Sequence, residues 1–192
     1  MRPSLPARYF LALTNRFPRC RPGLWRAWYD ALARRDLSGH LLFLNVGYDD
    51  DESRIPLDPD DEPFRYGIQL YLQAVQGLDL SAKDLLEVGC GRGGGGAFFL
   101  RYYNPRSYTG VDLSPAAIAW CQRHHAFPNA QWCIGRADDI PAASSSIDVV
   151  INVESSHSYP SVPAFLEEVH RVLRPGGHLA IADLRTAGRM AD

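Results

Sequence analysis

A short apolar run that leads directly into glycines is the feature that most restricts the fold of this 192-residue chain. Residues 84–88 read as a buried strand, and Gly89, Gly91 and Gly94 follow with the spacing G-x-G-x-x-G. Glycines at the end of a strand allow a tight turn and a close approach of the backbone to a ligand. The pattern predicts an α/β fold with a ligand site at the carboxyl end of this strand.

Strand and helix signals alternate regularly after residue 80, and this alternation is typical of a parallel sheet covered by helices. Apolar or β-branched runs predict further strands at residues 108–111, 131–134, 147–153 and 178–184. Helical patterns predict helices at residues 61–77, after Ser114 and after Ser161, with both serines as caps. A Pro-Gly-Gly turn at residues 175–177 is expected to end the last helix.

The composition limits the partners of the chain. The formal net charge of −2 gives no reason to expect nucleic acid, and the four cysteines show no metal-ligand spacing, so neither partner is predicted. No segment has the length and apolarity of a membrane span or of a signal-peptide core. These features together predict a cytoplasmic protein with reduced thiols.

The N-terminal region differs from the regular pattern that follows it. Most charged residues in the segment 1–40 are arginines, and most charged residues in the segment 49–62 are acidic. We predict a helical or irregular lid at residues 1–60 and a core at residues 61–192. One interpretation is a solvated basic arm followed by a solvated acidic loop. The other is a lid that faces a lipid acceptor or makes peripheral contact with a membrane.

The glycine loop alone fits two cofactors, and a carboxylate favours one of them. Dinucleotides such as NAD place a pyrophosphate beside such a loop, whereas S-adenosylmethionine (SAM) places a cationic amino group and a sulfonium there. Glu87 lies two residues before Gly89 and would repel a pyrophosphate, so it suits SAM better. Asp112 ends the second strand, 21 residues after Gly91 (112 − 91), where it can accept hydrogen bonds from ribose hydroxyls of either cofactor.

Four segments together resemble the class I SAM-dependent methyltransferases, namely residues 87–93, 112–114, 135–141 and 171–177. The similarity continues through residues 42–48 and 152–160, where it is closest to methyltransferases of dimycocerosate lipids and to natural-product O-methyltransferases. The resemblance implies that SAM is the cofactor. It also implies that Glu87, Gly89 and Gly91 line the methionine end of SAM, with Asn152 near it, and that Asp112 binds the ribose.

The resemblance also implies an adenine site, where this sequence departs from many relatives. Leu113 would pack on the adenine, and the backbone of Ala137 would meet its edge. Many relatives have an acid directly before this alanine, whereas this chain has Arg136, which only donates hydrogen bonds. Asp138 is the carboxylate expected to compensate.

The fold implied is a Rossmann-like methyltransferase sheet with helices on both faces. Such a sheet has seven strands when complete, and five are counted here. The chain is therefore expected to lack the C-terminal strands and to be a fragment, a shortened product, or half of a sheet that an oligomer or partner completes.

A hydroxyl acceptor must lose its proton, which favours a histidine or carboxylate near the transferred methyl group. His157 lies five residues after Asn152 (157 − 152) and is the predicted base, with Asp183 after the fifth strand as its assistant. The acceptor implied is a hydroxyl of a polyketide- or lipid-like small molecule. Simpler readings remain: a loop histidine bonded to backbone, a strand-end cap at Asp183, a SAM-binding subunit without catalysis, or an NAD oxidoreductase.

Overall fold

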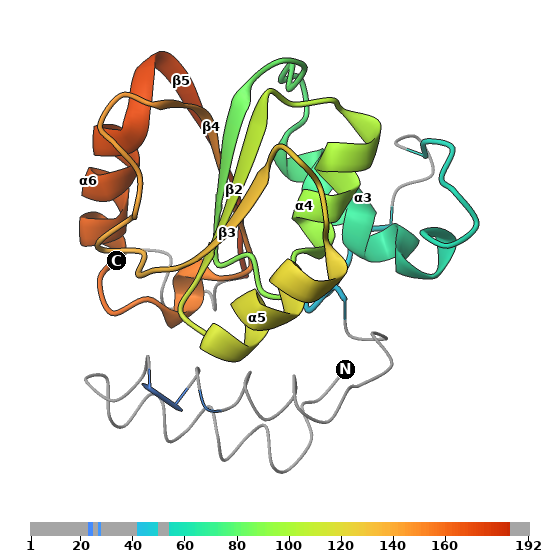
Figure 1. Ribbon diagram of the computed structural model, residues 1–192, viewed down its shortest axis with the longest axis horizontal. Helices are drawn as coiled ribbons and strands as arrows, with labels where there is room; N and C mark the ends of the chain where they lie inside the picture. Colours follow the sequence, from blue (N-terminus) through green and yellow to red (C-terminus); the bar gives the residue numbers. More distant parts are fainter. Residues whose placement is uncertain (1–22, 25–26, 28–41, 50–53, 185–192) are drawn as a thin grey trace.

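A parallel five-stranded sheet lies at the centre of the part of the chain that the structure describes (Figure 1). The structure is a computed structural model and describes residues 23–24, 27, 42–49 and 54–184. The strands are β1 (Asp84–Val88), β2 (Ser107–Asp112), β3 (Ala130–Ile134), β4 (Ile147–Val153) and β5 (Leu173–Ala182). The helices are η2 (Glu62–Phe64), α3 (Arg65–Ala74), α4 (Gly94–Tyr102), α5 (Pro115–His124), η3 (Ser156–Ser158) and α6 (Val162–Val172). Most of the predicted lid at residues 1–60 lies outside the described residues.

The strand order is β3-β2-β1-β4-β5, which confirms the predicted Rossmann-like α/β sheet. β1 pairs in parallel with β2 on one side and with β4 on the other, so that Leu85 lies between Tyr108 and Val149. The chain first runs outward from β1 through β2 to β3 and then crosses to β4 and β5. In open α/β sheets such a change of direction leaves a crevice at the carboxyl ends of the strands, where ligands bind.

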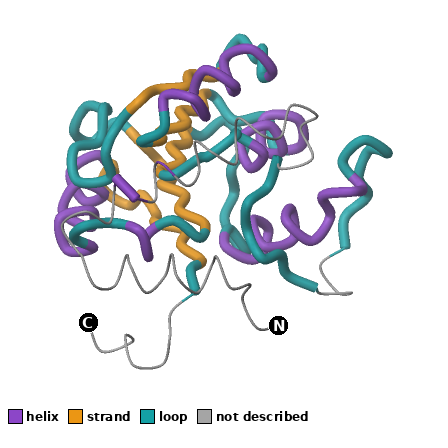
Figure 2. Tube along the Cα trace, turned by 90° about the horizontal axis from the view of Figure 1, so that it is seen from below, coloured by secondary structure: helices purple, strands orange, loops and turns teal. Residues whose placement is uncertain are grey.

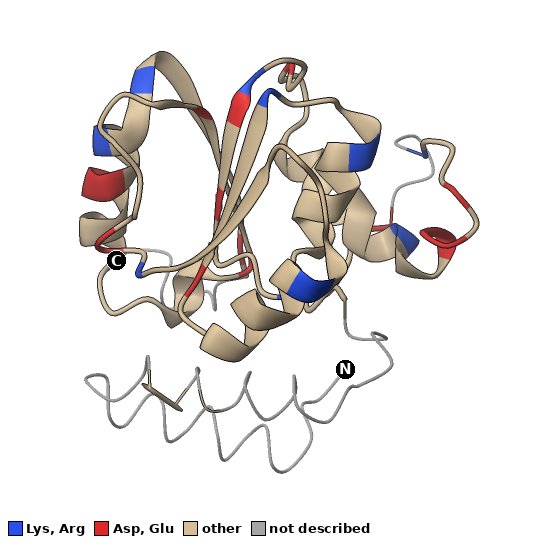
Figure 3. Cartoon of the chain, in the orientation of Figure 1, with Lys and Arg blue, Asp and Glu red and all other residues tan. Residues whose placement is uncertain are grey.

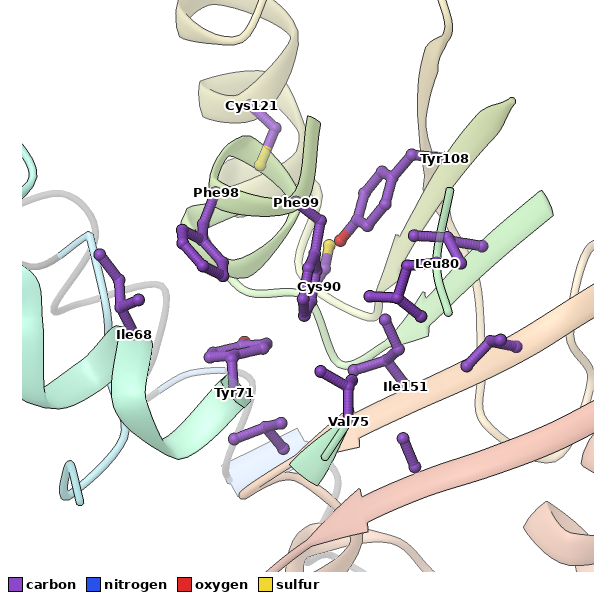
Figure 4. Packing of buried hydrophobic residues seen from close by; sticks show 14 of the residues in the cluster. Ile68, Tyr71, Val75, Leu80, Cys90, Phe98, Phe99, Tyr108, Cys121 and Ile151 are labelled. Carbon is purple, nitrogen blue, oxygen red and sulfur yellow. The ribbon is translucent and has the colours of Figure 1, made fainter. Parts of the chain in front are cut away.

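Helices cover both faces of the sheet, and Figure 2 shows the strands between them. One face packs against α3, α4 and α5 through a core that includes Ile68, Tyr71, Phe98, Phe99, Tyr108 and Cys121 (Figure 4). The opposite face packs against α6 through Leu86, Val150, Phe165, Val169 and Val172. Burial of apolar side chains on both faces is the main stabilising contribution to such a sheet.

Both predicted serine caps are confirmed. The side chain of Ser114 accepts a hydrogen bond from the backbone N–H of Ala117 at 3.1 Å, and Ser161 accepts one from Ala164 at 3.1 Å. A proline follows at the start of each helix, where its missing N–H has no cost. These caps set the positions at which α5 begins after β2 and α6 begins after β4.

The helix predicted at residues 61–77 is shorter in the structure. A 3₁₀ turn occupies residues 62–64, and α3 begins only at Arg65 and ends at Ala74. Asp61 does not cap the turn with its side chain, because its carboxylate accepts hydrogen bonds from Arg101 at 2.5 Å and from Tyr102 at 2.9 Å. A tertiary contact thus replaces the expected cap.

The fifth strand begins earlier than predicted. It starts at Leu173, directly after α6, and the Pro-Gly-Gly segment lies within it instead of before it. Leu173 pairs with Ile147 and His178 pairs with Val149, with an irregularity between the two pairs. The prolyl and glycyl residues form this irregular segment, and regular pairing resumes at His178.

Charged residues of both signs are spread over the described elements (Figure 3). At the amino end of β1, Arg106 donates to Asp84 at 2.8 Å, far from the carboxyl ends where the crevice lies. No helix among the described residues combines the length and the apolarity needed to cross a membrane.

Candidate functional site

A pocket lies at the carboxyl ends of the strands, where the strand order changes direction. Its lining comes from the loop after β1, the ends of β2 and β4, the loops after β3 and β4, and residues 42–45. The predicted residues that line it are Gly89, Gly91, Asp112, Leu113, Ala137 and Asp138. These six lie at the end of β2 or in the loops after β1, β2 and β3.

The glycine loop turns beside this pocket with backbone angles that favour glycine. Gly89 has φ +81° and Gly91 has φ +53°, and no atom lies within 4 Å of a Cβ built on Gly91. A non-glycine residue would therefore be strained at Gly91 even though space is present.

Asp112 fixes this loop from the end of β2. Its Oδ2 accepts a hydrogen bond from the N–H of Gly91 at 2.8 Å, and its Oδ1 accepts one from the N–H of Ser114 at 2.8 Å. Each oxygen of a carboxylate can accept more than one hydrogen bond, and Asp112 lines the pocket. The carboxylate is thus held in one orientation at the pocket.

Arg136 and Asp138 form a forked ion pair on the β3 side of the pocket. Arg136 donates from Nε to Oδ1 at 2.8 Å and from Nη2 to Oδ2 at 2.7 Å. The hydrogen bond from Arg136 lowers the pKa of Asp138. The residue that departs from the family pattern therefore orients the carboxylate expected to compensate for it.

Glu87 differs from its predicted place, because it does not line the pocket. It is fully buried, its Oε1 accepts a hydrogen bond from Tyr71 Oη at 2.6 Å, and its Oε2 accepts one from Tyr108. Figure 4 shows both tyrosines among the packed rings of the core. A Cβ on Gly95 or Gly96 would overlap the ring of Tyr71 or Tyr108, respectively. The second half of the glycine run therefore makes room for the two rings that bond Glu87.

Burial shifts the pKa of Glu87 away from its ordinary value. Loss of hydration raises its pKa to about 7, and the two tyrosine hydrogen bonds offset part of this rise. In the unfolded chain the pKa is near the ordinary 4.5. Between these pH values the unfolded chain releases a proton that the folded chain retains, so stability falls as the pH rises through this window.

We expect Glu87→Gln to remove this loss of stability at alkaline pH. The free energy of unfolding of the wild type should fall relative to that of Glu87→Gln by on the order of 3 kcal/mol between pH 5 and pH 8. Urea unfolding at both pH values measures the difference, with Glu167→Gln on the exposed face of α6 as the control. A difference that stays constant between the two pH values would show that Glu87 does not titrate in this range.

Asn152 also lies behind the pocket wall instead of in it. Its Nδ2 lies within hydrogen-bond distance of three acceptors: the carbonyl of Val88 at 2.9 Å, Ser155 Oγ at 2.8 Å and Tyr159 Oη at 2.8 Å. Ser155 and Tyr159 line the pocket, so Asn152 positions two lining side chains. Within the described residues, its buried Oδ1 has no hydrogen-bond partner.

His157 and Asp183 are brought together after β4 and β5. Nδ1 of His157 lies 2.8 Å from Oδ1 of Asp183, and the backbone N–H of His157 donates to Oδ2 at 2.7 Å. Burial opposes ionisation of Asp183, but hydrogen bonds from His157 and Ser156 outweigh it and lower its pKa. The histidine side chain therefore bonds a carboxylate, and Asp183 also accepts from the N–H of Leu184 as a strand-end cap would.

Neither residue of this pair lines the pocket, whereas their neighbours Ser155 and Ser158 do. The side chain of His157 is 27% exposed and that of Asp183 is 6% exposed. A carboxylate accepts hydrogen bonds and cannot donate them, so Nδ1 of a neutral His157 carries the proton. Nε2 then keeps its lone pair and can accept a proton.

Glu154 is a lining residue that the sequence interpretation missed. It follows the last residue of β4, its φ is +46°, and its backbone N–H donates to Ala182 at 2.7 Å. Burial and the charge of Asp183 raise its pKa, while a hydrogen bond from Val46 lowers it. Its position directly after a buried strand was the available signal, because side chains at strand ends meet at the site.

Comparison with known proteins agrees with this geometry. The family described as "Methyltransferase domain" matches residues 86–181. The phthiotriol/phenolphthiotriol dimycocerosates methyltransferase of Mycobacterium leprae is 45% identical over 170 residues, which cover 88% of this chain and 63% of that protein. A fatty-acid O-methyltransferase of Mycolicibacterium smegmatis is 44% identical over 158 residues, covering 82% of this chain and 58% of that protein. The chain thus spans less than two thirds of the length of these relatives.

Solved structures share the fold at low identity. The [4+2]-cyclase SpnF superposes with a TM-score of 0.68 at 20% identity, covering 85% of this chain and 62% of the cyclase. A putative sarcosine dimethylglycine methyltransferase from Galdieria sulphuraria superposes with a TM-score of 0.66 at 19% identity, covering 81% and 59% of the two chains. One fold thus carries proteins that are named for different reactions.

Proposed function

The chain belongs to the SAM-dependent methyltransferase family of the matching domain, and we propose that it transfers a methyl group to a hydroxyl of a polyketide- or lipid-like small molecule. The observation that carries the proposal is the His157–Asp183 pair, which directly follows the strands that end at the pocket. The names of the two mycobacterial relatives support a lipid-like acceptor, and one of them supports transfer to oxygen.

The residues at the pocket fit the cofactor of this family. Gly91 leaves open space at the loop, and the Asp112 carboxylate, a hydrogen-bond acceptor for ribose hydroxyls, lines the pocket. The charged lining consists of the carboxylates of Asp112, Asp138 and Glu154 and the guanidinium groups of Arg92 and Arg136. The family match at residues 86–181 supports SAM over the NAD alternative.

When SAM is bound, it supplies a methyl group on a sulfonium, which is already a good leaving group. The work left to the protein is to position the acceptor, to exclude water and to take the acceptor's proton. Asp112 and the glycine loop would hold the nucleoside. Leu113 and Ala137 would cover the adenine, and the Asp138 carboxylate, oriented by Arg136, would accept from its amino group.

His157 would accept the hydroxyl proton at Nε2. The bond from Nδ1 to Asp183 fixes the ring orientation and the tautomer, and the Asp183 carboxylate stabilises the imidazolium that forms. Asp183 stays ionised for this task because its pKa is lowered. Proton transfer then leaves the hydroxyl oxygen free to bond the methyl carbon.

An acceptor panel tests the proposal. The purified chain would be incubated with SAM labelled in its methyl group and with long-chain alcohols, carboxylic acids and amines of equal chain length. We expect labelled ether from the alcohols, identified by mass spectrometry. Label on nitrogen or carbon would contradict the hydroxyl assignment. Tight SAM binding with no labelled product from any acceptor would favour the alternative, a SAM-binding subunit without catalysis.

A further inference from the structure

A segment that precedes α3 in the sequence forms part of the pocket wall. We call residues 42–48 the strap. Leu42, Phe43, Leu44 and Asn45 of the strap line the pocket. Exposure alternates along it: Leu44, Val46 and Tyr48 are exposed, whereas Phe43 and Asn45 are partly buried. The strap therefore has one side that packs on the molecule and one that faces outward.

One side of the strap is fixed to α3 and α4. Asn45 donates from Nδ2 to the carbonyl of Gly67 at 3.1 Å, and the N–H of Tyr48 donates to Tyr66 at 2.9 Å. The ring of Phe43 lies over bare backbone, because a Cβ on Gly67 would come within 2.9 Å of Phe43 and one on Gly94 within 3.0 Å of its ring. The Phe43 side chain thus packs against glycines of two helices, α3 and α4.

The carboxylate of Glu154 joins the strap to the end of β4. The backbone N–H of Val46 donates to Oε2 of Glu154 at 3.0 Å, across 108 residues of sequence. Among the hydrogen bonds described for the strap, this one reaches the end of β4, whereas the bonds of Asn45 and Tyr48 reach α3. The strap is therefore bonded both to α3 and to the segment after β4, where Ser155, His157 and Asp183 also lie.

The backbone of Glu154 is arranged to present this carboxylate. Its φ of +46° is unusual for a residue with a side chain, and its N–H is bonded to β5 through Ala182. Left-handed backbone at a non-glycine residue is strained and persists where surrounding structure enforces it. The turn after β4 thus aims the Glu154 side chain at the strap and along the pocket wall.

We propose that Glu154 is a positioning residue that fastens the strap to the end of β4 at the pocket and thereby slows escape of the bound nucleoside ligand. The identity of that ligand rests on the proposed function, whereas the fastening itself does not. Phe43 packs one side of the strap against α3 and α4, and Glu154 accepts a hydrogen bond from the strap backbone at Val46. A closed strap would separate the ligand from water on the side where the methyl group leaves.

The test compares Glu154→Ala with Glu154→Gln. Both variants keep a side chain at the strained φ, but only glutamine retains an oxygen that can accept from the N–H of Val46. Loss of a hydrogen bond to a charged group corresponds to roughly tenfold in an equilibrium. We expect hydrogen exchange of the ligand-free strap amides, and dissociation of S-adenosylhomocysteine, to be about tenfold faster in Glu154→Ala. Both rates should stay within about threefold of the wild type in Glu154→Gln.

Glu167→Ala, on the exposed face of α6, serves as the control and should change neither rate. Unchanged strap exchange in Glu154→Ala would overturn the proposal. Equal acceleration of dissociation in both Glu154 variants without a change in strap exchange would also overturn it, because Glu154 would then contact the ligand directly through its charge. Exchange is read without ligand, so it reports on the fastening even where methyl transfer fails.

Discussion

Replacement of His157 by alanine is expected to slow methyl transfer to a hydroxyl acceptor by about 10²–10⁴-fold, the usual contribution of a general base. Affinity for SAM should change little, because His157 does not line the pocket. Turnover under saturating SAM and calorimetry of S-adenosylhomocysteine measure the two effects separately. A turnover within a few-fold of the wild type would show that His157 is not the base.

Two comparisons separate a proton-transfer role from a structural one. A carboxylate acceptor has no proton to remove at neutral pH, so its methylation should be nearly unaffected by His157→Ala. Asp183→Asn places an amide donor opposite Nδ1 and favours the tautomer with its proton on Nε2, so it should slow hydroxyl methylation as well. Because the two residues act as a unit, the double variant should be no slower than the slower single variant. His170→Ala, at an exposed position of α6, is the matched control.

Replacement of Asp112 by alanine is expected to weaken S-adenosylhomocysteine binding strongly. The ligand would lose one or two hydrogen bonds to a carboxylate, each contributing roughly 1.5–3 kcal/mol. The loop would also lose the acceptor for the N–H groups of Gly91 and Ser114. Calorimetry of the variant measures the sum, and an unchanged affinity would contradict the ribose assignment.

A thermodynamic cycle separates the loss of the ribose contact from the loss of the loop hydrogen bonds. It combines Asp112→Ala with a ligand that lacks one ribose hydroxyl. Removal of the 2′-hydroxyl from S-adenosylhomocysteine should reduce affinity for the wild type but should matter little in Asp112→Ala. Equal losses in both proteins would show that Asp112 acts only through the loop. The melting temperature of the ligand-free variant reports the structural cost separately.

Much of the fold follows from local sequence signals. The predicted bounds of β1 and β4 agree with the structure, because both are apolar runs with clear turn residues beside them. Ser114 and Ser161 cap their helices as predicted, because a capping side chain bonds backbone only three residues away. Such features depend on neighbours in the sequence, so they can be read without the fold.

The differences arise where distant residues compete with local preference. Asp61 bonds Arg101 and Tyr102 instead of capping a helix, and β5 starts at Leu173 because that residue pairs with Ile147. The carboxylate of Glu87 turns into the core because two tyrosines from α3 and β2 bond it there. None of these partners can be identified from spacing along the chain.

The residues of the site also divide into those that local spacing predicts and those that depend on distant contacts. The loop glycines, Asp112 and the residues after β3 could be predicted, since motifs with fixed spacing place them at the ends of strands. The pairing of His157 with Asp183 could be expected from the ends of adjacent strands. The Glu154 contact with the strap could not, because it joins residues 108 positions apart and depends on a left-handed backbone angle.

We propose that the pocket at the ends of β1, β2 and β4 binds the SAM nucleoside and directs its sulfur toward the His157 side. A crystal structure of the chain with S-adenosylhomocysteine tests it most directly. We expect the ribose hydroxyls within hydrogen-bond distance of Asp112, the adenine between Leu113 and Ala137, and the sulfur on the side of Ser155 and Glu154. A ligand bound away from the glycine loop, or with its ribose remote from Asp112, would contradict the account.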